Sequence, residues 1–236
     1  MPVDEELFQS LRKRRREDLQ SFLEQVYGPV HRMAYALGGR EDVGNGIIRF
    51  VITQGLRHLD SWRDAEMAER WFWHHTVLTS RRAQRHPPGA KDDVLLRSAG
   101  GPDAQYAAFV RTLRDLPFQQ REAFILHHGE RFDSRRLAIA MDCSTHAAAM
   151  HLHAAHDAIK ALVGPSFAAM NDRMTRAYVG LTAAESLMRP AIRRHVARSL
   201  WPRRLRRAIA AIAALALLAT AAWAGVRFGF FRRFGW

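Results

Sequence analysis

Apolar residues recur every three or four positions along the first third of the chain, a period typical of amphipathic helices. The first such face covers residues 22–37 and contains Pro29, where we expect a new helix to begin or the helix to kink. Two further helical patterns follow at 47–59 and 69–79. Because strand signals are very few, residues 1–82 predict a small all-helical domain.

Pro, Gly and charged residues interrupt the middle of the chain, with one short apolar patch at 94–96. This composition is typical of a connection between domains, so we expect a linker at 83–104. Helical periodicity then resumes and continues until Gly164-Pro165, which predicts a second helical domain at 105–164.

This second domain has the layout of a helix-turn-helix: two helices, a three-residue turn and a last helix that would enter the major groove of DNA. Ser144 precedes the last helix as a candidate N-cap. A stripe on that helix is expected to be buried, namely Ala148, Leu152, Ala155, Ile159 and Leu162. The side chains expected to contact DNA are Arg135, Arg136, Ser144, Thr145, His146, Ala149, His151 and His153.

An uncharged, apolar run covers residues 208–226 near the end of the chain. About 20 such residues cross the hydrocarbon core of a bilayer. We therefore expect a transmembrane helix at 208–226, preceded by a basic amphipathic juxtamembrane segment at 165–207 and followed by a short basic and aromatic tail at 227–236. The alternative is a buried helix of a soluble protein.

The net charge of +13 is concentrated after residue 164, where thirteen arginines face two acidic residues. A polyanion, either nucleic acid or an anionic membrane, is the partner that such a charge favours. Seven of these arginines lie at 193–207, just before the apolar run, and three follow it. The positive-inside rule then predicts a single-pass protein of the inner membrane, with its N-terminal domains in the cytoplasm.

The sequence offers little chemistry for catalysis. It has no nucleophile–base set, no Gly-rich phosphate loop and no HExxH motif, so we expect no enzyme and no cofactor. His151, His153 and His156 do not share one helix face, and neither a cysteine nor a carboxylate completes a metal site with them. Cys143 is the one cysteine, which excludes an intrachain disulfide and fits a reducing compartment.

The two halves together resemble a group-4 (extracytoplasmic-function) bacterial sigma factor, over about residues 19–163. The family's region 4 is a helix-turn-helix domain that reads the −35 promoter element. The residues that match its pattern are Leu116-Pro117, Arg121-Glu122, Leu137-Ala138 and Ser144.

The aromatic stretch Trp71-Phe72-Trp73, followed by Arg81-Arg82, resembles region 2 of the same family. In that region aromatic and basic residues engage and melt the −10 element. The resemblance implies that the −10 contacts are Trp71, Trp73, His74, Arg81 and Arg82. Aromatic residues at helical spacing are also typical of a core, which is the alternative interpretation.

The resemblance also implies a polymerase-binding helix, with Asp42, Asn45 and Arg49 as its contact positions. The family usually has an acidic helix here, whereas this chain reads Gly-Asn-Gly-Ile-Ile-Arg over residues 44–49. Arg49 stands where Glu is usual, so carboxylates that would meet the polymerase are missing.

Together with the apolar run, the resemblance implies a membrane-tethered, sigma-factor-like protein that recruits RNA polymerase core to promoter DNA for transcription initiation. Its partners would be RNA polymerase core, promoter DNA, membrane lipid and, as a further candidate, an anti-sigma or other membrane protein. The alternative is a membrane-anchored interaction or regulatory protein that uses a degenerate sigma fold without activating polymerase.

Overall fold

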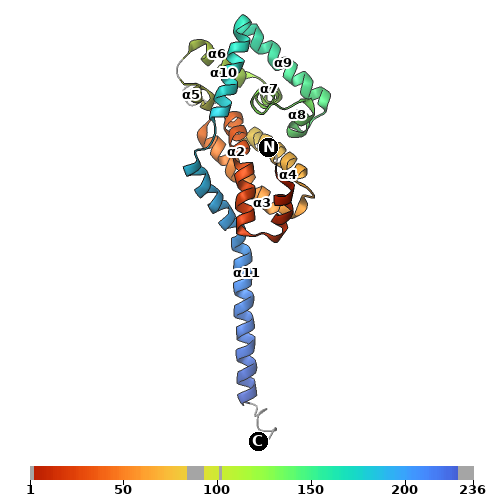
Figure 1. Ribbon diagram of the computed structural model, residues 1–236, viewed down its shortest axis with the longest axis vertical. Helices are drawn as coiled ribbons and strands as arrows, with labels where there is room; N and C mark the ends of the chain where they lie inside the picture. Colours follow the sequence, from red (N-terminus) through yellow and green to blue (C-terminus); the bar gives the residue numbers. More distant parts are fainter. Residues whose placement is uncertain (1–2, 84–92, 101–102, 228–236) are drawn as a thin grey trace. The chain divides into compact units, whose positions relative to one another are not determined.

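The computed structural model describes residues 3–83, 93–100 and 103–227, without the side chains at 202–204, 206–208, 210–211 and 224–227. This part of the chain holds eleven α-helices, three short 3-10 helices and no strand (Figure 1), which confirms the all-α fold expected from the sequence. The chain divides into two compact units, Met1–His195 and Val196–Trp236.

Three long helices and a short one form the first part of the Met1–His195 unit. Their bounds are α1 Glu5–Ser10, α2 Arg16–Gly38, α3 Glu41–His58 and α4 Ala65–Ala83, with 3-10 turns at Leu11–Lys13 and Leu59–Ser61. Leu23, Ile52 and Phe72 are fully buried among them, because the periodic apolar positions face one another. α2 contains Pro29 in its interior, so no new helix begins at that residue.

The second part of this unit holds six more helices. They are α5 Val94–Ser98, α6 Ala104–Asp115, α7 Phe118–Glu130, α8 Ser134–Met141, α9 Thr145–Val163 and α10 Phe167–Gly180, with a 3-10 turn at Gly164–Ser166. Four of them begin after a side chain that accepts a backbone N–H of the first turn; the capping residues are Asp93, Asp103, Asp133 and Ser144. These caps satisfy backbone donors that the helix itself cannot, which fixes where each helix starts.

The two parts of the unit share one hydrophobic core. Leu37 of α2 and Trp73 of α4 belong to the same buried cluster as residues from α5 to α10. Arg114 of α6 reinforces this contact: its guanidinium pairs with Asp93 at 2.6 Å and donates to the backbone oxygen of Ala36 in α2 at 2.7 Å.

The expected linker at 83–104 lies partly outside the described residues, at 84–92 and 101–102. Its described part includes α5, whose Val94 and Leu95 are buried in the shared core. The short apolar patch seen in the sequence is therefore a core segment, because burying it removes two large side chains from water.

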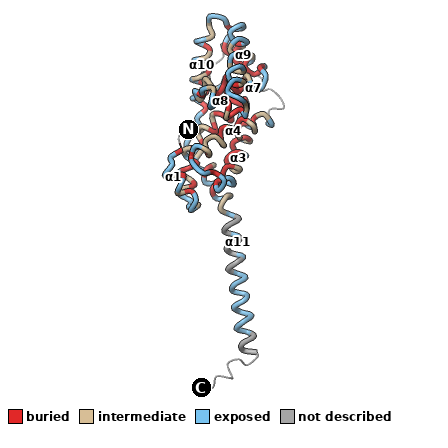
Figure 2. Tube along the Cα trace, turned by 90° about the vertical axis from the view of Figure 1, so that its right-hand side faces the viewer, coloured by how far each residue is buried: buried red, intermediate tan, exposed pale blue. Residues whose placement is uncertain are grey.

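α11, Glu185–Arg227, is one helix that continues from the first unit into the second. In the second unit its described side chains at 212–223 are all exposed, and Figure 2 shows this stretch in pale blue. Part of the expected transmembrane run, 208, 210–211 and 224–226, lies outside the residues whose side chains are described. Among the described residues, no helix has the length and apolarity that crossing a membrane requires.

Candidate nucleic-acid interface

Two helices joined by a three-residue turn, as expected from the sequence, lie at α8, residues 142–144 and α9. Asp142 ends α8 in the left-handed conformation, with φ at 57°. Ser144 then caps α9, since its hydroxyl accepts the backbone N–H of Ala147 at 3.1 Å. The free N–H groups at this helix end form a partially positive surface that favours phosphate.

α9 buries a stripe that differs from the expected one at its end. Ala148, Ala155 and Ile159 are fully buried and Leu152 is half-buried, whereas Leu162 is exposed and Val163 is buried in its place. A helix has 3.6 residues per turn, so a strict alternation of three and four drifts away from the core over five positions.

Most of the side chains expected to contact DNA on α8 and α9 are exposed. Those open to solvent are Arg135, Arg136, Ser144, Thr145, His146, Ala149 and His153, whereas His151 is half-buried. His153 is paired through its Nδ1 with Asp157 one turn later, at 2.9 Å. Arg135 and Arg136 therefore supply the positive charge of this surface, and Asp157 reduces it on α9.

The −10-like residues of α4 lie in a different environment. Trp71 is half-buried and stacks on His75, with ring centroids 3.8 Å apart. Trp73 is 6% exposed and packs on Phe132, with a centroid distance of 4.9 Å. His74 is half-buried and Arg82 is exposed. Trp73 is therefore an aromatic core residue, which was the alternative interpretation of this stretch.

Arg81 of α4 is hydrogen-bonded to residues of α7 and α8. Its guanidinium donates to both carboxylate oxygens of Glu122, at 2.8 and 2.7 Å, and to the backbone oxygen of Met141 at 3.0 Å. Glu122 is 2% exposed, and burial raises its pKa while Arg81 opposes that rise. The same bond raises the pKa of Arg81, and the pair joins α4 to α7 and α8.

The three positions that the resemblance implies for polymerase binding lie together on the outside of α3. Asp42, Asn45 and Arg49 are all exposed at spacings of three and four residues, which places them on one helix face. Asp42 accepts two bonds from Arg40, at 3.0 and 2.8 Å, and this pairing lowers its pKa. Asn45 accepts the hydroxyl of Tyr35 at 3.1 Å.

Two features of this unit escaped the sequence analysis. The first is the pair His128–His156, whose Nε2 atoms lie 2.8 Å apart between α7 and α9. Asn171 of α10 bonds to Nδ1 of His128 at 3.0 Å, and burial lowers the pKa of His128 to about 3. The consecutive histidines at 127 and 128 are visible in the sequence, but only the fold shows that the ring of His128 lies between α7, α9 and α10.

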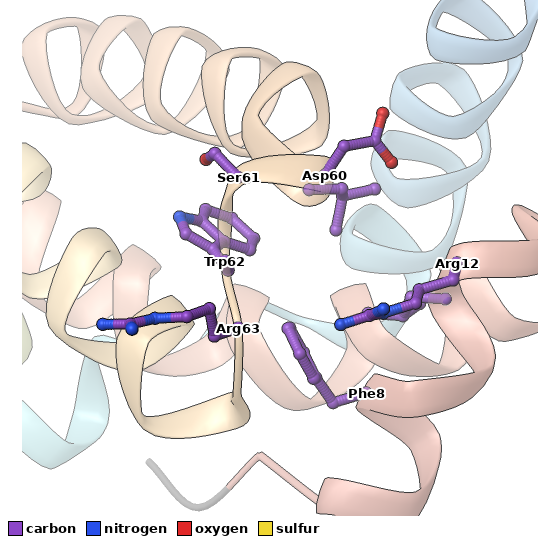
Figure 3. A pocket seen from close by; sticks show the side chains of 8 residues that line it. Phe8, Arg12, Asp60, Ser61, Trp62 and Arg63 are labelled. Carbon is purple, nitrogen blue, oxygen red and sulfur yellow. The ribbon is translucent and has the colours of Figure 1, made fainter.

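The second is a pocket of about 320 Å³ between the N-terminal helices and the segment that connects α3 to α4. Figure 3 shows Phe8 and Trp62 in this pocket together with the guanidinium groups of Arg12 and Arg63. Trp62 is buried, and its indole nitrogen has no hydrogen-bond partner within the described part of the chain. None of the expected site residues lines this pocket.

Across the described ranges, no group of three or more His, Cys, Asp or Glu side chains is arranged to hold a metal ion. Comparison of the chain with protein-family models, with curated proteins and with solved structures found no match.

Proposed function

We propose that this protein is a sigma-type transcription factor that recruits RNA polymerase core to promoter DNA. The helix-turn-helix supports this most strongly, because α9 begins at the Ser144 cap and exposes its first turns to solvent. Arg135 and Arg136 at the start of α8 supply cations for phosphate contacts. In this proposal α2–α4 act as the region-2-like domain and α6–α9 as the region-4-like domain.

The polymerase would bind the outer face of α3. Asp42, Asn45 and Arg49 support this, because they are exposed together on one rigid helix. Arg40 neutralises Asp42, and Arg49 adds a positive charge, so the face lacks the negative charge of the family it resembles. We therefore expect binding to polymerase to be weak.

The proposal includes a tether to the inner membrane, with the N-terminal unit in the cytoplasm. The uncharged run 208–226 supports it, and so does the exposure of Ile212, Leu215 and Leu218, since exposed apolar groups of this size need cover. Replacing Leu215 and Leu218 with lysine should release the protein from membranes in an alkaline carbonate wash, and retention of this variant would count against a tether.

A second candidate function is an interaction protein that retains the fold without activating polymerase. The contacts of α4 favour it, because Trp73 and Arg81 are engaged within the unit. The partner would then be a protein that docks on α3 or α9, and not promoter DNA.

The test is capture of purified RNA polymerase core by the full chain in detergent, with and without Asn45→Asp and Arg49→Glu. The carboxylate introduced by Asn45→Asp would still accept the Tyr35 hydroxyl, so the change adds charge without losing that bond. We expect each replacement to strengthen binding by about 1 kcal/mol, or roughly fivefold. Arg111→Glu, at an exposed position of α6, is the matched control with no expected effect. If neither form captures polymerase, the interaction protein is the better function.

A further inference from the structure

The segment after the helix-turn-helix, residues 167–195, lies beyond the part of the chain that resembles a sigma factor. It comprises α10 and the first turns of α11, and it contacts both parts of the unit. On the second part, Ser98 of α5 donates to the backbone oxygen of Ala177 at 2.8 Å. Tyr178 donates its hydroxyl to Glu130 of α7 at 2.8 Å.

The ring of Tyr178 packs closely against the backbone of α7 at Gly129. Tyr178 is fully buried, and a Cβ atom added at Gly129 would lie 2.7 Å from its Cδ2 atom. The absence of a side chain at residue 129 thus lets α10 approach α7 closely.

The same segment is also bonded to the first part of the unit. Nδ1 of His31 in α2 lies 2.7 Å from the backbone oxygen of Leu181, so this nitrogen carries the proton and donates it. The hydroxyl oxygen of Thr53 in α3 and Nδ1 of His195 in α11 lie 3.4 Å apart. Ile192 of α11 is only 1% exposed and lines a groove with residues of α2.

A network of three side chains joins both sets of contacts. Glu130 of α7 accepts Tyr178 of α10 and also pairs with Arg32 of α2, at 3.2 Å. A half-buried carboxylate that accepts from two donors on two different helices holds all three helices together. Residues 167–195 therefore stabilise the arrangement in which α7 and α8 cover Trp73 and Arg81 of α4.

We propose that residues 167–195 are an intramolecular clasp that keeps Trp73 and Arg81 of α4 covered, so that its release precedes their contact with single-stranded DNA. The regulatory part of this inference rests on the proposed function, because that function supplies the ligand. Contacts made only in the covered state favour that state, and removing them shifts the population toward the open one.

The test uses the full chain in detergent with Cys143→Ser, and with spin labels on cysteines introduced by Arg57→Cys in α3 and Ala158→Cys in α9. Both labelled positions are exposed. Ile192→Asp places a charge at a buried position of the clasp, and Leu187→Asp makes the same change where the side chain is 72% exposed. Distances between the labels are measured by pulsed electron resonance, and binding of a fluorescent oligothymidylate by anisotropy.

We expect Ile192→Asp to add a longer distance and to tighten oligothymidylate binding roughly threefold or more, with no change for Leu187→Asp. An unchanged distance in a variant with normal helicity would overturn the clasp. A longer distance between the labels without tighter oligothymidylate binding would overturn the role of the clasp in covering a DNA site. The proposed function would then be judged by the capture of polymerase alone. If Ile192→Asp does not fold, Tyr178→Phe decides the same question, because it removes the bond to Glu130 and keeps the ring in place.

Discussion

The helices α9 and α4 carry the two candidate DNA-contacting surfaces, and the structure treats them in opposite ways. α9 exposes Thr145, His146 and Ala149 to solvent. α4 instead packs Trp73 on Phe132 and pairs Arg81 with Glu122. A surface that reads DNA must be reachable, so α9 is open to DNA in this arrangement of the unit, whereas Trp73 and Arg81 of α4 are not.

The difference follows from the side chains at each surface. Thr145, His146 and Ala149 of α9 have short or polar side chains, which lose little by remaining in water. α4 has large aromatic rings, and burying each one removes about 150–250 Å² from water. The ring that would make Trp73 a stacking residue therefore also favours its burial, which the contact with Phe132 provides.

Disrupting the Arg81–Glu122 pair should have the largest effect on the packing of α7 and α8 against α4. Arg81→Ala would leave the carboxylate of Glu122 buried without its cation, and we expect a loss of about 2–3 kcal/mol in the free energy of unfolding. Arg82→Ala, at the neighbouring exposed position, should change it by less than about 0.5 kcal/mol. Urea denaturation of the two variants measures both values. Equal stabilities would mean that the pair does not hold α4 in place.

The aromatic packing of α4 can be tested through the glycines of α3. A Cβ atom at Gly55 would lie 2.5 Å from Cζ of Phe72, whereas one at Gly46 would meet nothing within 4 Å. Gly55→Ala should therefore destabilise the unit by about 2 kcal/mol through overpacking. Gly46→Ala should stabilise it by about 0.5–1 kcal/mol, because alanine favours the helix interior. Thermal unfolding of both variants would contradict the packing argument if the two shifts had the same sign.

The packing of α9 against α7 depends on the neutral forms of His128 and His156. Burial first, and then His127 and His156, lower the pKa of His128 from 6.5 to about 3. The unfolded chain therefore binds a proton that the folded chain does not, and stability is complete above about pH 6.5 and declines below it. The expected slope is about 1.4 kcal/mol per pH unit for each such group. In His128→Gln, urea denaturation between pH 4 and 6.5 should give a shallower slope; an equal slope would assign the protons to other groups.

The sequence predicts local features of this fold well. The Ser144 cap and the start of α9 at Thr145 follow from residue types within a few positions of each other. The burial of Val94 and Leu95 was missed because their partners lie elsewhere in the chain. The partner of Arg81 was missed for the same reason, since Glu122 is 41 residues away. A periodic pattern shows which side chains need cover but does not show what covers them.

We propose that duplex DNA contacts α8 and α9 and not α4, and titration of the full chain with a fluorescent duplex at fixed salt distinguishes the two surfaces. Arg135→Ala combined with Arg136→Ala should weaken binding roughly tenfold, because two phosphate contacts are lost. Trp71→Ala and Arg82→Ala should leave binding within about twofold of the wild type. A loss of binding with either of these α4 variants as large as with the α8 pair would contradict the account.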